Sequence, residues 1–135
     1  MAIEFFIEPQ LSAKEFQAVL VASTLAERRP AQDLHRLDRM LRHANVIATA
    51  RDAGRLVGVS RAITDYSYCC YLSDLAVDEQ YQRQGIGKRL IEETLRAAGG
   101  DDVTLILVAA PAAEGYYPKV GMKHLPSCWS VPRKR

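Results

Sequence analysis

The residues best suited to chemistry form a short polar loop at residues 82–87, Gln-Arg-Gln-Gly-Ile-Gly. The loop lies between an apolar, strand-like run that ends at Val77 and a helical pattern that begins at Lys88. The first N–H groups of a helix have no intrahelical partner, and the helix dipole adds positive charge there. Because glycine also lets a phosphate approach the backbone closely, the loop is predicted to hold a diphosphate.

The order of residues in the loop distinguishes between known phosphate loops. A Walker A loop needs Gly-Lys-Ser/Thr, but Arg89 follows Lys88 and Gln82 stands at the place of the first glycine. A dinucleotide fingerprint needs a third glycine, where Leu90 stands. The pattern Q-x-x-G-x-G, preceded by Leu-Ala-Val, resembles the coenzyme A pyrophosphate loop of the GNAT-type N-acetyltransferases. The alternative is a helix N-terminus whose glycines serve packing.

This resemblance implies acetyl-CoA as cosubstrate and direct transfer of its acetyl group to a primary amine, without an acyl-enzyme. In the family, a strand that splays from its parallel neighbour contacts the thioester and the pantetheine arm through its backbone. Here that strand would present Leu75, Ala76 and Val77. The residues implied for the pyrophosphate are Arg83, Gln84, Gly85, Ile86, Gly87 and Lys88.

The leaving thiolate is helped by a proton donor. Residues 113–122 resemble the family pattern A-x-x-x-Y-x-K-x-G-F, whose tyrosine, Tyr117 here, protonates the thiolate. A tyrosine with a pKa of about 10 can give up a proton and regain it from solvent. Pro118 pushes the residue before it away from helical geometry, so Tyr116 is an alternative acid. Packing alone is the alternative role for both rings.

The group that accepts the proton of the amine is marked less clearly. Leu105 stands where some relatives place a glutamate. Asp74 is the nearest carboxylate, directly before the proposed thioester contacts, and is the candidate to bind the ammonium group or accept its proton through water. A turn-capping role for Asp74 is the alternative, and Glu114 is a second candidate base.

In this fold class the first two helices and the last strands build the acceptor groove. The candidates there are Arg28, Arg29 and Trp129. The two arginines could clamp a carboxylate or phosphate, or form a solvated break between helices. Trp129 could form an aromatic wall of the groove or pack in the core as part of a last strand.

A short chain without a peptide-docking insertion favours a small-molecule amine over a protein tail as the acceptor. The other functions left open are a non-catalytic acyl-CoA-binding module and an acetyltransferase for protein or peptide amines.

Composition fits a single domain over residues 1–135, with 48% apolar and 25% charged residues. A net charge of +2 gives no reason to expect nucleic acid or membrane as partners. No secretory signal is evident, and three cysteines without C-x-x-C spacing fit a reducing cytoplasm. The three histidines are scattered, so no metal site is expected.

Hydrophobic patterning predicts a mixed α/β fold. The sheet is expected to be mostly antiparallel, with a central parallel pair and flanking helices, and the family resemblance implies that this pair is splayed. An unpaired last strand would favour a homodimer. The predicted strands are residues 3–7, 46–50, 56–63, 68–77, 103–109 and 128–131, and the predicted helices lie at about 12–25, 34–41, 88–98 and 111–119.

Overall fold

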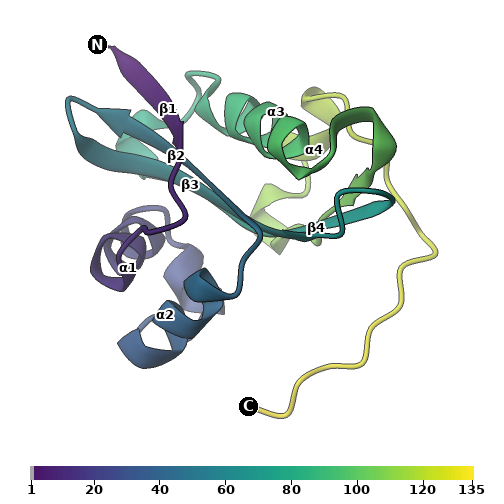
Figure 1. The fold of residues 1–135 in the computed structure, drawn as a ribbon, viewed down its shortest axis with the longest axis horizontal. Helices are drawn as coiled ribbons and strands as arrows, with labels where there is room; N and C mark the ends of the chain where they lie inside the picture. The colour runs from purple at the N-terminus through teal and green to yellow at the C-terminus, as the bar shows by residue number, and fades with distance from the viewer. Residues whose placement is uncertain (1) are drawn as a thin grey trace.

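The computed structural model describes residues 2–135, and they form a five-stranded sheet with helices on both faces (Figure 1). The strands lie in chain order: the first four are antiparallel neighbours, and the last two form a parallel pair. The predicted mixed α/β class is confirmed. The strands are β1 (Ile3–Ile7), β2 (Val46–Asp52), β3 (Arg55–Thr64), β4 (Cys69–Val77) and β5 (Thr104–Ile106).

Two helical layers enclose the sheet. Helices α1 (Ala13–Ala22) and α2 (Leu34–Arg42) cover one face, and α3 (Ile86–Ala98) covers the other (Figure 1). The short α4 (Tyr116–Lys119) lies beyond the N-terminus of α3. Four short 3-10 turns complete the elements: η1 (Leu25–Arg28), η2 (Glu79–Tyr81), η3 (Gly100–Asp102) and η4 (Pro111–Ala113). None of the helices in residues 2–135 is both long and apolar enough to cross a bilayer.

Helix α1 begins with a capping serine, close to the predicted start at about residue 12. The Ser12 hydroxyl accepts a hydrogen bond from the Glu15 N–H at 3.1 Å and satisfies a free donor of the first turn. The Glu15 carboxylate instead pairs with Arg51 of β2 at 2.7 Å. The helix ends at Ala22, three residues before the predicted end, and η1 follows it.

Strands β2 and β3 form the predicted hairpin. Ala53 and Gly54 connect them with φ angles of 50° and 87°, both in the left-handed region. Two such residues in a row make the tight turn whose twist matches the flanking strands.

The register between β3 and β4 shifts near the middle of the sheet. Arg61 is opposite Asp74, but Ala62 is opposite Leu72, so Ser73 is an extra residue on β4. Such a bulge bends a strand and redirects its side chains. It places Asp74 on the side of the sheet that α1 covers and leaves Leu75 facing α3.

Two predicted strands need correction. β5 covers only Thr104–Ile106, and Ile106 and Val108 are exposed, so the prediction of a strand at 103–109 buried on both faces is wrong. An apolar run does not reveal that its strand lies at the edge of a sheet.

The second correction concerns residues 128–131, which form no strand. Trp129 is 91% exposed, and the segment belongs to an extended tail (Figure 1). Prolines at 126 and 132 bracket this segment and supply no N–H for pairing. The predicted homodimer was expected to form through the strand at residues 128–131. That strand is absent, and the homodimer stays a prediction.

The turn between β3 and β4 is held by one carboxylate. Asp65 Oδ1 accepts hydrogen bonds from the backbone N–H groups of Ser67, Tyr68 and Cys69 at 2.9, 2.8 and 3.1 Å. These bonds lower the pKa of Asp65 to about 2. Since its unfolded pKa is about 3.9, the carboxylate stabilises the fold above that pH, and the contribution is lost as pH falls towards 2.

Asp65→Asn should therefore remove part of the acid sensitivity of the fold. The free energy of unfolding, measured by urea titration between about pH 4 and pH 2, should fall less steeply in the variant than in the wild type. Asp101→Asn, an exposed aspartate without a side-chain hydrogen bond in the described part of the chain, is the matched control. Equal slopes for wild type and Asp65→Asn would contradict the assignment.

Candidate functional site

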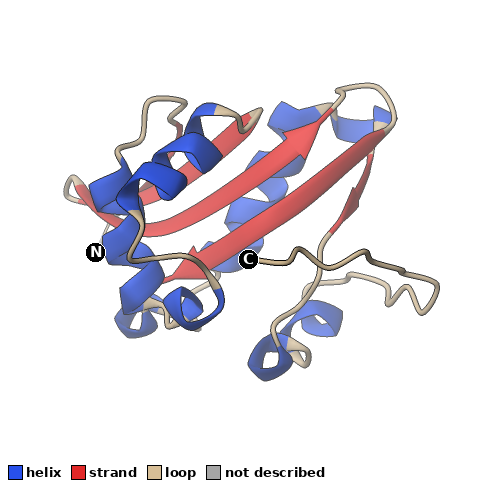
Figure 2. Cartoon of the chain, turned by 90° about the horizontal axis from the view of Figure 1, so that it is seen from below, coloured by secondary structure: helices blue, strands red, loops and turns tan. Residues whose placement is uncertain are grey.

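The edge of β4 is open over its second half. β5 pairs with β4 only at Cys69, Cys70 and Tyr71, and then the two strands part (Figure 2). From residue 72 to 77, β4 has no strand on that side among residues 2–135. The predicted splay is therefore present, and the edge that carries Leu75, Ala76 and Val77 is available to pair with an extended ligand.

The predicted phosphate loop follows directly. Arg83 and Gly85 have φ angles of 65° and 80°, and this left-handed backbone turns the chain into α3. Helix α3 begins at Ile86, two residues earlier than predicted. The N–H groups of its first turn have no intrahelical acceptor and make an anion site. Five of the six predicted pyrophosphate residues line one cleft, and the exception is Gln84.

Gly87 is required by close approach. A Cβ atom at this position would lie 2.5 Å from the hydroxyl oxygen of Tyr116. Real Cβ contacts are not this short, so the ring of Tyr116 sits over the N-terminus of α3 only because residue 87 has no side chain. The contact joins α4 to the phosphate loop.

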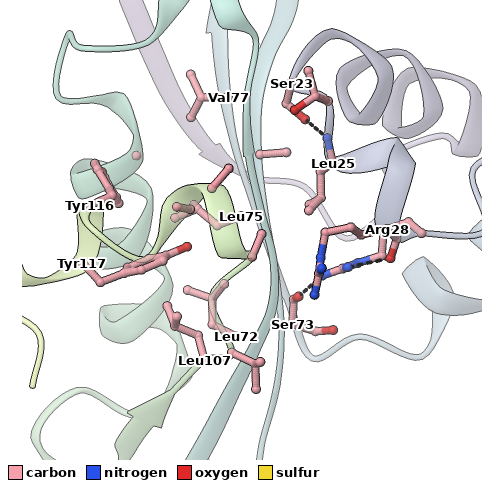
Figure 3. Close-up of a pocket in the computed structure, with 18 of the residues that line it drawn as sticks. Ser23, Leu25, Arg28, Leu72, Ser73, Leu75, Val77, Leu107, Tyr116 and Tyr117 are labelled. Atoms are coloured by element: carbon pink, nitrogen blue, oxygen red, sulfur yellow. Dashed lines mark hydrogen bonds between the residues drawn. The ribbon is translucent and has the colours of Figure 1, made fainter. Parts of the chain in front are cut away.

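The cleft has a volume of about 1720 Å³ and wraps around the open edge of β4. One end, which we call the cofactor arm, lies on the α3 side and includes the phosphate loop and both tyrosines. The other end, the acceptor arm, lies across β4 and includes Ser23, Leu25 and Arg28 (Figure 3). The two arms meet beside Leu75.

The two tyrosines of α4 have different surroundings. The Tyr117 ring points from α4 towards β4, whereas the Tyr116 hydroxyl lies over Gly87 (Figure 3). Burial raises the pKa of Tyr117, the neighbouring Tyr116 raises it further, and Arg29 across the cleft opposes the shift. The phenol is therefore protonated at neutral pH. Tyr117 is helical despite Pro118, because a proline in the first turn of a helix removes no hydrogen bond.

Asp74 is 0% exposed and paired on both oxygens. Arg29 Nε donates to Oδ1 at 2.6 Å, and Arg61 Nε donates to Oδ2. Both guanidinium groups also donate a hydrogen bond to Ser73. Arg29 Nη2 donates to its backbone carbonyl at 2.7 Å, and Arg61 Nη2 donates to its hydroxyl oxygen at 3.1 Å. A carboxylate so buried and so bonded is poorly placed to receive a proton directly from an amine.

Arg61 also lines the cleft and pairs with Asp74, and the sequence analysis did not identify it. A lone charged residue in an otherwise apolar strand indicates a buried partner, and this signal was present in residues 56–63. The register that sets Arg61 opposite Asp74 depends on the bulge at Ser73, which the sequence does not mark.

The remaining candidates divide between the cleft and the surface. Arg28 and Arg29 line the acceptor arm as predicted. Trp129 lies in the exposed tail, outside the cleft lining and outside any core, so neither predicted location for its ring is correct. Glu114 is exposed and does not line the cleft. No group of ligating side chains able to hold a metal ion occurs in residues 2–135.

Comparison with known proteins agrees with this geometry. A family model described as "Acetyltransferase (GNAT) domain" matches residues 9–127. The chain is 33% identical over 70 residues to the chloroplastic GCN5-related N-acetyltransferase 2 of Arabidopsis thaliana, a match that covers 51% of this chain and 27% of the relative. It is 28% identical over 106 residues to histone acetyltransferase TAP1 of Glycine max, covering 70% of this chain and 46% of the relative. The chain thus spans less than half the length of these curated relatives.

The fold is also shared with a solved structure. A probable acetyltransferase from meticillin-resistant Staphylococcus aureus superposes with a TM-score of 0.79 at 21% identity, over 99% of this chain and 100% of that one. At this identity the likeness shows the fold alone.

Gly87→Ala should weaken the binding of coenzyme A, the diphosphate that the sequence resemblance implies. The new Cβ must displace Tyr116 or the start of α3, and overpacking of this kind costs about 1–3 kcal/mol of folding stability. Because the displaced groups form the proposed anion site, the affinity measured by calorimetry should also fall. In Gly87→Ala/Tyr116→Phe the nearest atom becomes the ring carbon at 3.3 Å, so affinity should largely return to that of Tyr116→Phe alone.

Gly115→Ala is the matched control for this series. A Cβ at Gly115 meets no protein atom within 4 Å, and the residue has an ordinary φ of −74°, so this variant should fold like the wild type. Gly115 also lines the cleft, so the variant tests the addition of a methyl group at a cleft position without a contact to Tyr116. Undiminished binding by Gly87→Ala would show that the close approach has no part in the site.

Asp74→Asn should chiefly lower stability. Breaking a buried ion pair on one side costs about 3–5 kcal/mol, because Arg29 and Arg61 would lose their shared counter-charge. Chemical denaturation measures the loss. A variant of normal stability that is inactive would instead favour Asp74 as the base.

Proposed function

Because the chain belongs to the acetyltransferase (GNAT) family, we propose that it transfers the acetyl group of acetyl-CoA to a primary amine of a small molecule. One observation carries the proposal. The open edge of β4 lies in a single cleft between the first turn of α3 and the ring of Tyr117. The cleft therefore offers three features in the order of the parts of acetyl-CoA. The anion site suits the pyrophosphate, the open edge suits the linear pantetheine arm, and the proton donor suits the thioester sulfur.

The chain's own groups fit the cofactor. When bound, coenzyme A supplies the acetyl group as a thioester. The free N–H groups of Ile86, Gly87 and Lys88, with the side chains of Arg83 and Lys88, would hold the pyrophosphate. The backbone of Leu75, Ala76 and Val77 would pair with the pantetheine arm at the open edge. Gln84 would contribute only through its backbone.

The acetyl transfer requires two acts from the protein. A backbone N–H at the open edge of β4 polarises the carbonyl oxygen. The amine nitrogen forms a bond to the carbonyl carbon as the carbon–sulfur bond breaks, and the Tyr117 hydroxyl gives its proton to the sulfur. The proton of the amine leaves to water. The predicted role of Asp74 as base has not been tested, and its contacts favour a positioning role in which it holds Arg29 at the junction of the arms.

Two other functions remain to be separated by experiment. A non-catalytic acyl-CoA-binding module needs the loop and the open edge but not the hydroxyl of Tyr117. An acetyltransferase for a protein amine is the third possibility, since the relative TAP1 is called a histone acetyltransferase. Thiol release from acetyl-CoA, measured across small amines and lysine peptides, distinguishes all three. The homodimer and the cytoplasmic setting stay predictions.

Tyr117→Phe should keep affinity for coenzyme A and lose turnover by about 10²- to 10⁴-fold, the usual contribution of a general acid. The raised pKa of Tyr117 means that the wild-type donor is lost only when pH rises past the ordinary tyrosine value of about 10, so the rate should fall there. The variant should lack this alkaline fall. Rates are measured by thiol release from about pH 6 to about pH 11, a range that extends from well below to just above the ordinary tyrosine pKa of about 10.

Tyr116→Phe is the matched control, because it deletes the same atom from the neighbouring ring. Its turnover should change far less than that of Tyr117→Phe. The reverse order would exchange the roles of the two tyrosines, and normal turnover in the double variant would exclude a tyrosine acid.

A further inference from the structure

The acceptor arm of the cleft is rich in arginine. Among the described residues, Glu27 and Glu79 are the only carboxylates that line the cleft, and Glu79 belongs to η2 beside the phosphate loop; the tail residue Arg133 also lines the cleft. Four further guanidinium groups belong to the acceptor arm. They come from three different elements: Arg28 and Arg29 from the η1 segment, Arg36 from α2 and Arg61 from β3.

Two of these arginines share one counter-charge. Arg29 and Arg61 both bond to the Asp74 carboxylate, so the cluster keeps one net positive charge. The Arg61 side chain is only 10% exposed, and a poorly solvated charge is costly unless an anion compensates it. Each guanidinium group has five N–H donors, and each of these two uses three in the contacts described.

The other two arginines have no carboxylate partner within residues 2–135. The Arg28 side chain makes no hydrogen bond or ion pair there, and Arg36 donates only to the backbone carbonyl of Arg135 at 3.1 Å. This contrasts with the exposed arginines of α3, since Arg89 and Arg96 both pair with Glu93. The acceptor arm therefore holds free donors that suit a carboxylate or a phosphate.

We propose that the acceptor amine carries a carboxylate or phosphate group, which Arg28 binds together with the spare donors of the Asp74 cluster and Arg36. This inference rests on the proposed acetyl transfer and assigns the class of its substrate. With its anion held at η1, such a molecule would point its amine towards the junction of the two arms beside Leu75. The reaction leaves the anion unchanged, since only the bond between nitrogen and the acetyl carbon forms.

The same charges argue against strongly cationic acceptors. A polyamine or a lysine-rich peptide would bring additional positive charge to an arm that already has four arginines against the carboxylates of Glu27 and Asp74. Like charges brought together at an interface suppress the wrong partner.

The test uses pairs of amines that differ in the anion. β-Alanine is compared with β-alaninamide, and phosphoethanolamine with ethanolamine, by thiol release from acetyl-CoA. Arg28→Gln should raise KM about 10- to 100-fold for the amine that carries the carboxylate or phosphate, in whichever pair is used, with little change in kcat. The KM of the amine that lacks this group should not change. Each variant is compared with the wild type on the same amine, so differences in the reactivity of the amines cancel. The pair that responds distinguishes a carboxylate site from a phosphate site.

Two further variants control the result. Arg39→Gln removes the same charge from an exposed position of α2 outside the cleft and should leave every KM unchanged. Arg28→Lys keeps the charge and should recover part of the loss. Thermal unfolding confirms that each variant folds, and Arg28→Gln leaves intact the Arg28 carbonyl that accepts a bond from Arg29 at 2.8 Å.

The outcomes separate this inference from the function on which it rests. An equal kcat/KM of the wild type for the amines with and without the anionic group, or an equal effect of Arg28→Gln on both, would overturn the anion site and leave acetyl transfer standing. Coenzyme A binding by calorimetry without thiol release for any amine would overturn both.

Discussion

The separation of β4 from β5 after Tyr71 is the constraint on which the rest of the site depends. A strand edge inside a protein normally finds a partner, because unpaired backbone groups are unfavourable when they lose water. Here the edge is kept open by elements that meet it from both sides: the helix-terminal loop and α4 on one face, and η1 with its arginines on the other. The cleft wraps around this edge, so a ligand on one side of the sheet can react with a ligand on the other.

The buried carboxylate of Asp74 holds the acceptor side together. It lies one residue after the bulge at Ser73, and the bulge turns it towards the α1 side, where Arg29 and Arg61 meet it. Arg29 thereby ties η1 to the open strand. The same pairing leaves the cluster of Arg29, Arg61 and Asp74 one positive charge in excess, so a contact that stabilises the fold also contributes to the electrostatic character of the site.

The cofactor side could be predicted from the sequence because it is local. The open strand, the phosphate loop and the first turn of α3 occupy residues 72–88, and their order alone implies an anion site. The prediction of Tyr117 as the acid rests on a spaced pattern within ten residues and stays a prediction. The strand predictions failed where the structure of a segment depends on contacts with residues far away in the sequence. The apolar run at 103–109 does not reveal that β5 lies at the edge of the sheet, and residues 128–131 do not reveal that no edge pairs with them.

The acceptor side could not be predicted in the same way, since its groups meet only in the folded chain. Arg28, Arg36 and Arg61 come from a 3-10 turn, a helix and a strand, and a one-residue shift in the β3–β4 register decides whether Arg61 faces Asp74. A chain can therefore keep the cofactor loop and change its acceptor through a few substitutions at such positions. The charge of the acceptor arm, more than the fold, is the property that carries information about which amine this protein selects.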